Sequence, residues 1–284
     1  MNAEIALIGG SGMSDAALIE NASTVSISTP FGPPSSPIVL GQVHGRACAF
    51  LARHGPGHRF PPSSVDYRAN IYALKTLGVT TIIAISAVGS LKEEIKPLDI
   101  VIPDQIYDRT KLRSNTFFED ISVHVSFTDP FCADVSESLR QATQNVGGNP
   151  TLGGTYVCIE GPQFSTRAES NVYRRLGFDV IGMTAMPETK LAREAEICFG
   201  MLATVTDYDV WREQEVTIET VISNVKKNEE NTRKIIKEVV PLLPESGEAC
   251  ECRHALRDAI VTSREVIPDA VKERLGPLIE KYVA

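Results

Sequence analysis

Short apolar runs, rich in β-branched residues, alternate along the chain with stretches whose apolar positions recur at helical spacing. The short runs are bounded by Gly, Pro or polar residues, which is typical of buried strands. Eight runs are predicted to be strands: 5–10, 37–43, 47–54, 80–90, 99–106, 155–161, 178–183 and 200–208. The second and third of these are separated by His44, Gly45 and Arg46, which predicts a tight hairpin.

The stretches with helical spacing carry recognisable start and stop signals. Helices are predicted over 63–78, 164–177, 186–201, 219–243, 255–266 and 269–283. Thr166 and Glu169 form a capping box, Pro187 suits a first helical turn, and Pro244 stops the long amphipathic helix before it. Residues 244–254 are predicted to be a surface connector between that helix and the last two.

Buried strands that alternate with helices predict an α/β fold with a largely central sheet. A chain of 284 residues is long enough for one large domain of this class. We therefore predict a main domain over 1–243 and, over 244–284, a C-terminal helical extension of the same domain.

Composition and charge exclude several classes of partner. Apolar residues make up 43% of the chain and charged residues 23%, as in globular enzymes. The net charge of −8 argues against nonspecific binding to nucleic acid and against attraction to anionic membranes. No apolar run approaches the roughly 20 residues that cross a bilayer, and the N-terminus lacks the basic region of a signal peptide. These features favour a cytoplasmic protein.

The cysteines leave two interpretations open. Only Cys250 and Cys252, among six cysteines, are close in sequence. No second Cys/His pair has a suitable spacing, which argues against zinc. The six are either ordinary thiols, or include a disulfide, within the CxC or to another cysteine, which would be unusual in a mesophile's cytosol.

Polar groups follow several of the predicted strands, where ligands gather in α/β folds. Ser11 lies in the Gly-rich "GGSG", whose backbone N–H groups can approach an anion, although a plain tight turn has the same pattern. Arg53 and His54 follow another strand, and the Arg fork suits phosphate; a surface ion pair is the alternative. Ser86 offers a hydroxyl and Ala87 an N–H to a ligand; the alternative is that they only cap a helix or strand.

Two further strand ends complete the crevice. Met183 and Thr184 follow the same logic, although a Met more commonly fills a core. Asp207 and Asp209 point the same way from one strand, and like charges held close resist ionising together. One of them is expected to keep its proton near neutral pH, unless the segment is a solvated turn or N-cap. The residues alone thus predict an α/β enzyme with an oxyanion-binding crevice and an unusual acid pair.

Several segments together carry a resemblance to a known family: "IALIGGSGM", "TPFGPPS", "LARHGPGHRFPPSSVDYRANIYALK", "SAVGSLKEEIKPLDIVIPDQIYDRT", "EGPQFSTRAES", "MTAMPE" and "TDYDVW". In order and spacing, from about residue 4 to 242, they resemble the trimeric purine nucleoside phosphorylases, and within these the methylthioadenosine branch. The resemblance implies a single-domain fold with a mixed central sheet, partly closed into a barrel and surrounded by helices. It also makes 1–243 the catalytic domain.

The resemblance implies a pentosyltransferase of purine and methionine salvage. It would cleave 5′-methylthioadenosine with phosphate, giving adenine and 5-methylthioribose 1-phosphate. Phosphate is then a co-substrate, and no metal or organic cofactor is implied. A broader purine nucleoside or methylthioinosine phosphorylase is the alternative. A nucleosidase that uses water is disfavoured by Arg53 and His54, and a non-catalytic nucleoside-binding protein by the complete set of polar positions.

The resemblance also assigns the site residues. Those implied to bind phosphate are Ser11, Arg53, His54, Ser86, Ala87 and Thr184. Met183 would lie along the ribose. A protonated Asp207 would donate to the purine 7-nitrogen and support its departure, while an ionised Asp209 would accept from the 6-amino group. Relatives that use 6-oxopurines differ at the Thr206-Asp207 pair and at Ser165.

The 5′ end of the substrate is implied to meet apolar side chains of Ile218, Val221 and Ile222. His124 would come from a neighbouring subunit, which implies a homotrimer, alone or paired as a hexamer. An apolar wall favours a methylthio group over a hydroxyl by about 1–2 kcal/mol.

Overall fold

The first strand, β1 (Ile5–Gly9), is buried on both faces in the computed structural model, which describes residues 2–11, 13, 16–212, 218–245 and 250–283. Because side chains alternate along a strand, Ile5 and Leu7 join one apolar cluster while Ala6 and Ile8 join another. A sheet with two covered faces needs helices on both sides. The sequence prediction of an α/β fold with a central sheet is confirmed.

The strands form one mixed sheet around β1. Its main path runs β2 (Glu20–Val25), β3 (Ile38–Val43), β4 (Arg46–Ala52), β1, β5 (Thr81–Ser90), β10 (Val180–Gly182), β9 (Thr155–Ile159) and β7 (Gln105–Arg109). Three more strands lie off this path: β11 (Cys198–Asp207), β6 (Ile100–Ile102) and β8 (Thr151–Leu152). Strands β1, β4, β5 and β11 are parallel, so their carboxyl ends meet at one edge.

The pairings also return on themselves. β5 pairs with β11, β11 with β6, and β6 with β8. The chain of β8 continues after two residues as β9, which pairs with β10, and β10 returns to β5. β6 continues in the same way into β7 beside β9. This circuit is the partly closed barrel that the family resemblance implies.

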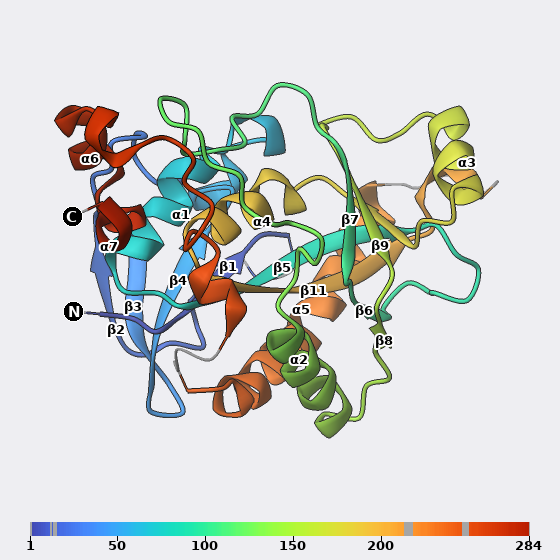
Figure 1. Ribbon diagram of the computed structural model, residues 1–284. Coiled ribbons are helices and arrows are strands. Elements are labelled where there is room, and N and C mark those ends of the chain that lie inside the picture. The colour runs from blue at the N-terminus through green and yellow to red at the C-terminus, as the bar shows by residue number, and fades with distance from the viewer. Residues whose placement is uncertain (1, 12, 14–15, 213–217, 246–249, 284) are drawn as a thin grey trace.

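Helices cover both faces of the sheet. Their bounds are α1 (Tyr67–Thr76), α2 (Ala133–Asn145), α3 (Arg167–Arg175), α4 (Ala185–Glu194), α5 (Ile218–Leu242), α6 (Asp269–Leu275) and α7 (Glu280–Val283). Figure 1 shows α1 and α4 on one side of the long strands β5 and β11, and α2 and α5 on the other. The C-terminal segment, in red, returns to the side of α1, where Leu256, Leu275 and Ile279 are buried in the main core.

Local signals in the sequence are confirmed at several turns. His44 and Gly45 both have positive φ, 50° and 76°, between the paired ends of β3 and β4. The Thr166 hydroxyl accepts from the Glu169 N–H at 3.2 Å, and the Glu169 carboxylate accepts from the Thr166 N–H at 2.7 Å, which completes the capping box. The cap of α1 is Asp66, whose carboxylate accepts from Ala69 N–H at 3.0 Å.

Other expectations were wrong, mainly at element boundaries. The predicted strand 99–106 is two strands with a bend at residues 103–104, and the predicted helix 186–201 ends at Glu194, so that β11 can begin at Cys198. Helix α2 and strands β2 and β8 were not predicted, because their sequences are largely polar. The predicted helix 255–266 is instead an irregular segment with a β-bridge between Val123 and Ile260. The predicted helix 269–283 is interrupted at Gly276.

The predicted surface connector 244–254 also differs from expectation, since Cys252 within it is buried. Residues 246–249 of that segment lie outside the described residues. Among the ranges that the structure describes, no helix combines the length and the apolar character needed to cross a membrane. The division at residues 243 and 244 stays a prediction.

Candidate active site

A cavity of about 680 Å³ opens where the parallel strands end. Gly10 and Ser11 follow β1, and Arg53 and His54 follow β4. Residues 86–89 belong to the C-terminal half of β5. Thr206 and Asp207 end β11, beside Gly89. The cavity therefore occupies the edge where ligands bind in parallel α/β sheets.

Most of the predicted site residues line this cavity. They are Ser11, Arg53, His54, Ser86, Ala87, Met183, Thr184, Thr206, Asp207, Asp209, Val221 and Ile222. The strand-end argument thus brought together side chains that are up to 198 residues apart in sequence (11 to 209), and the family resemblance added Val221 and Ile222. Their individual contacts decide what each can do.

Arg53 is buried and its guanidinium is held by Glu188. Its Nε donates to Glu188 Oε1 at 2.7 Å, its Nη2 to Oε2 at 2.8 Å, and its Nη1 to the Ile85 carbonyl at 2.9 Å. Burial opposes the charge, but the ion pair with Glu188 outweighs it and raises the pKa of Arg53. The alternative of a surface ion pair is wrong, because the ion pair that Arg53 forms is buried in the interior. Arg53 nevertheless lines the cavity.

His54 is a neutral ring. Burial, with the charge of Arg53 next, lowers the pKa of His54 to about 4. Its Nδ1 lies 2.8 Å from the Phe60 carbonyl, which can only accept, so Nδ1 carries the proton and Nε2 is an acceptor. In this tautomer, Nε2 can accept a hydrogen bond from a protonated phosphate oxygen. The His58 ring stacks on His54 at 4.1 Å.

Three hydroxyls gather beside Arg53. Ser86 Oγ lies 3.1 Å from the Tyr156 hydroxyl and 3.3 Å from Thr184 Oγ1. Burial raises the pKa of Tyr156 to about 12, so this hydroxyl keeps its proton. Hydroxyl protons can rotate toward an incoming anion, and such a group suits phosphate better than a fixed acceptor would.

Arg113 fixes the loop that carries Met183 and Thr184. Its Nη1 donates to the carbonyl of Met183 at 2.7 Å, and its Nε donates to the Glu160 carboxylate at 2.9 Å. Its side chain is 2% exposed. The backbone of this loop is thus anchored from behind, although Arg113 does not line the cavity.

The Asp207 carboxyl lies in a hydrogen-bond chain that can hold a proton. The single proton of the Thr206 hydroxyl has two acceptors, Val88 O at 3.2 Å and Asp207 Oδ2 at 2.7 Å. When Thr206 donates to Val88 O, the short contact needs a proton on Asp207 Oδ2. Burial raises the pKa of Asp207, against the hydrogen bonds from Thr206 and from Asp209 N–H at 2.7 Å. The geometry therefore accommodates Asp207 with or without its proton.

Asp209 is the second member of the acid pair. It is 4% exposed, and its Oδ2 makes no hydrogen bond of normal geometry within the described residues, although the Ser170 hydroxyl is near enough to lower its pKa. Burial first, and the charge of Asp207 after it, raise the pKa of Asp209 to about 6. A Cβ at Gly89 would lie 3.0 Å from Asp207 Oδ1 and 3.3 Å from Asp209 Cβ, so the lack of a side chain there lets the pair sit against β5. A buried acceptor without a hydrogen bond of normal geometry indicates a place for a ligand donor.

The apolar part of the lining comes from α5 and from the segment before α3. Val221, Ile222 and Val225 contribute from α5, and Phe164 from the other side. Ile222 is 50% exposed and Phe164 is 56% exposed, so this wall is incomplete in a single chain.

Two predicted residues, His124 and Ser165, do not line the cavity, and the structure does not describe the side chain of a third, Ile218. His124 is exposed, and its Nε2 lies 3.4 Å from Ser122 Oγ. Ser165 does not line the cavity, and its Oγ is buried without a partner. Ile218 begins α5, but its side chain lies outside the described residues.

Some residues of the site were missed from the sequence. Glu188 stands in the quoted "MTAMPE" and His58 in "ARHGPGHRFPP", so the motifs contained them without showing their contacts. Arg113 and Tyr156 lie in no strand-end motif. Glu188 is one of four charged residues in α4, so nothing in the sequence marked it as the partner of Arg53.

Within the described part of the chain, one group of side chains could hold a metal ion, namely Cys132, Cys198, Cys250 and Cys252. None of these lines the cavity. The chemistry available at the cavity is therefore that of hydroxyls, two guanidinium groups, two imidazoles, an ammonium group and three carboxyls.

Comparison with known proteins points in the same direction. The family model described as Phosphorylase superfamily matches residues 4–241. The chain is 52% identical to the S-methyl-5′-thioadenosine phosphorylase of Koribacter versatilis, over 99% of this chain and 97% of that protein. It is 49% identical to the protein of the same name from Geobacter sulfurreducens, over the full length of both.

Solved structures agree with these sequence matches. A methylthioadenosine phosphorylase from an antarctic soil metagenomic library superposes with a TM-score of 0.93 and 51% identity, over 98% of this chain and 99% of that one. The methylthioadenosine phosphorylase of Schistosoma mansoni, in complex with adenine, gives a TM-score of 0.87 and 36% identity, over 92% and 99%.

Proposed function

The chain belongs to the phosphorylase superfamily, and from that premise we propose that it cleaves 5′-methylthioadenosine with phosphate. The products are adenine and 5-methylthioribose 1-phosphate. The observation that carries the proposal is the acid pair: the buried Oδ2 of Asp209, which makes no hydrogen bond of normal geometry, beside the carboxyl of Asp207, whose pKa is raised by burial. An aminopurine offers a donor and an acceptor to such a pair, and a 6-oxopurine does not offer the donor.

The spacing along β5 supports a nucleoside between two binding ends. Ser86 and Gly89 are three residues apart on β5, which is about 10 Å. The Ser86 hydroxyl lies at one end of this stretch and the acid pair lies beside Gly89 at the other. A ribose with a base on one side and a phosphate on the other spans such a distance. The geometry thus supports phosphate near Ser86, Thr184 and Arg53, and the base near Asp207.

The reaction follows from these positions. As the bond between the sugar and the base breaks, its electron pair moves into the purine, and Asp207 donates its proton to the 7-nitrogen. Ionised Asp209 accepts a hydrogen bond from the 6-amino group and so orients the ring. General acid assistance of this kind contributes about 10² to 10⁴ in rate.

Phosphate acts at the other face of the sugar. An oxygen of the anion stabilises the developing positive charge and then bonds to the sugar carbon that the base has left. Arg53 and the hydroxyls fix the anion, and holding both reactants in line contributes several kcal/mol, of the roughly 7–11 kcal/mol available to positioning. Every group in this scheme is a side chain or a substrate, so it needs no further cofactor.

The test is turnover of a nucleoside panel with and without phosphate. We expect methylthioadenosine to be cleaved fastest, adenosine more slowly and inosine least, and all cleavage to require phosphate. Faster use of inosine than of methylthioadenosine at equal concentration would overturn the substrate. Cleavage in phosphate-free buffer indicates a hydrolase, and no cleavage of any nucleoside indicates a binding protein.

We also propose that the working unit is a homotrimer, alone or paired into a hexamer. Support comes from the open apolar wall at Phe164 and Ile222, which a neighbouring subunit could complete. A neighbour could bring His124 to the 5′ end of the substrate. Light scattering should give a mass of three or six chains; a monomer with full activity contradicts this.

A further inference from the structure

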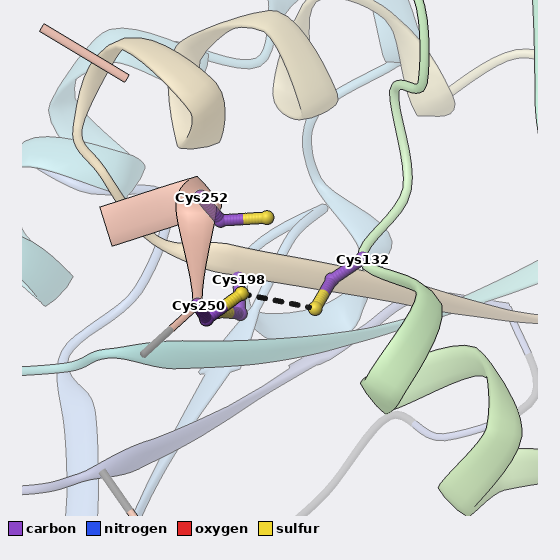
Figure 2. Close-up of side chains that lie close together, drawn as sticks. All are labelled: Cys132, Cys198, Cys250 and Cys252. Atoms are coloured by element: carbon purple, nitrogen blue, oxygen red, sulfur yellow. Dashed lines mark hydrogen bonds between the residues drawn. The ribbon is translucent and has the colours of Figure 1, made fainter. Parts of the chain in front are cut away.

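Four cysteine side chains from three separate segments meet at the beginning of β11. Cys132 is the N-cap of α2, Cys198 is the first residue of β11, and Cys250 and Cys252 flank Glu251 in the C-terminal segment. Their sulfur atoms all lie within 4.8 Å of one another. Figure 2 shows the side chains of Cys132, Cys250 and Cys252 directed from different elements toward one small region, with Cys198 behind Cys250.

The spacing of the sulfurs suits a tetrahedral metal ion. A zinc–sulfur bond of about 2.3 Å places the corners of a ZnS₄ tetrahedron about 3.8 Å apart. Cys250 Sγ lies 3.8 Å from Cys132 Sγ and 3.4 Å from Cys198 Sγ. Small side-chain rotations would bring all four sulfurs to these corners. Thiolates are soft ligands, and four of them in this shape favour zinc over magnesium or calcium.

The position of the cluster is that of a structural site. Cys132, Cys198 and Cys252 are buried and Cys250 is half-buried, so little water reaches the sulfurs. Four protein ligands leave no open coordination position for a substrate. Asp207 is nine residues further along β11, about 30 Å away, so the cluster is remote from the proposed chemistry.

The sequence argument against zinc was incomplete for a physical reason. It searched for two pairs at short spacing, and only Cys250 and Cys252 form one. The fold supplies the other two sulfurs singly, because the Cys132 N–H donates to the Phe199 carbonyl at 2.9 Å and so ties the start of α2 to the start of β11.

We propose that Cys132, Cys198, Cys250 and Cys252 bind one zinc ion, which fastens the C-terminal segment to α2 and β11. The segment that follows places Leu256, Leu275 and Ile279 in the main core, so its attachment contributes to the stability of the whole domain. The site is independent of the proposed nucleoside chemistry. A disulfide between two of the cysteines is the competing outcome.

Metal content is the first measurement. The untagged protein is produced with zinc in the medium, purified without chelator, and measured by plasma mass spectrometry. We expect about one zinc ion per chain. Cys132→Ser and Cys252→Ser should retain a small fraction of it. Cys48→Ser is the matched control, since Cys48 is buried in the same apolar cluster but is not one of the four ligands, and it should keep the full content.

A second measurement keeps the test decisive if the serine variants do not fold. Wild-type protein, reduced and stripped of metal, is titrated with Co²⁺, which gives intense visible absorption only with tetrahedral thiolates. Zinc should raise the midpoint of thermal unfolding of the same sample, and a chelator should reverse the rise. No bound metal and no cobalt or zinc uptake overturns the proposal. So does thiol titration, in denaturant, that finds two or more cysteines oxidised in protein purified without reductant.

Discussion

The carboxylate of Glu188 forms a bidentate ion pair with one edge of the Arg53 guanidinium, and both side chains are buried. Their exposed fractions are 2% and 1%, and the Nε–Oε1 and Nη2–Oε2 distances are 2.7 and 2.8 Å. The ion pair fixes the orientation of Arg53, which is the fully buried cation among the described residues that line the cavity. Glu188 is therefore a positioning residue for Arg53.

Removal of this carboxylate should be costly. Glu188→Ala leaves a buried guanidinium without its counter-charge, and breaking a buried pair in this way costs about 3–5 kcal/mol of unfolding free energy. Urea denaturation measures the loss. Glu137→Ala is the control, because Glu137 also pairs with an Arg, Arg140, but on the surface, and it should change little. Equal effects of the two variants would contradict the role of Glu188.

The proton on Asp207 should control turnover rather than binding. Asp207→Asn keeps the size of the side chain and can donate a hydrogen bond, but it cannot transfer a proton to the purine. We expect kcat with methylthioadenosine to fall by about 10² to 10⁴. Equilibrium binding of methylthioadenosine, measured by calorimetry without phosphate, should change far less. A variant with kcat near that of the wild type would show that the 7-nitrogen is protonated in another way.

Thr206 offers a milder change at the same place. Thr206→Val removes the hydroxyl that lies 2.7 Å from Asp207 Oδ2 and keeps the shape of the side chain. The variant loses the hydrogen bond that Thr206 donates to Asp207, and this bond lowers the pKa of Asp207, so the pKa should rise further. The pH at which activity falls on the alkaline side should therefore move upward, which a variant that only loosened packing would not produce.

The acid limb of the pH profile should report Asp209. Burial raises the pKa of Asp209 to about 6, so the carboxyl is mostly ionised at pH 7 and becomes protonated as the pH falls through 6. Protonated Asp209 is a poorer acceptor for the 6-amino group. We expect kcat/KM for methylthioadenosine to fall below about pH 6, approaching tenfold per pH unit. A flat profile down to pH 5 would contradict this assignment.

Most of the candidate site residues line one cavity, whereas several predicted element boundaries were wrong. Residues at the ends of parallel strands must meet, so Ser86 and Asp207 could be placed together from the strand pattern and the family motifs. Glu188 could not be assigned to Arg53, because the two are 135 residues apart and nothing local marks the pairing. The tautomer of His54 could not be predicted either. It is set by the Phe60 carbonyl, and the direction of that carbonyl depends on how the turn between residues 54 and 60 folds.

The cysteine cluster also could not be predicted from the sequence. Cys132 and Cys250 are 118 residues apart, and their approach to 3.8 Å depends on α2, which the sequence did not reveal. Short-range spacing finds sites built on one turn or hairpin. A site whose ligands come from separate elements becomes visible only when the tertiary fold is known.

A last prediction concerns a carboxyl outside the active site. Glu194, at the end of α4, is buried, and it accepts from the Phe117 N–H at 2.8 Å and the Thr116 hydroxyl at 2.7 Å. Burial raises the pKa of Glu194 to about 7, from an ordinary value of 4.5. Between these values the folded state binds more protons than the unfolded state. Stability from this group is therefore full below pH 4.5, falls as the pH rises to 7, and is level above.

Glu194→Gln tests this directly. Its Oε1 can accept from the Phe117 N–H while its amide donates to the Thr116 hydroxyl, and it stays neutral at every pH. The variant should therefore match the wild type near pH 4.5 and gain on it up to pH 7, by about 3 kcal/mol of unfolding free energy. Urea denaturation at several pH values measures the difference. The exposed Glu137→Gln should show no such trend, and parallel curves for Glu194→Gln and the wild type would mean that Glu194 is already ionised at low pH.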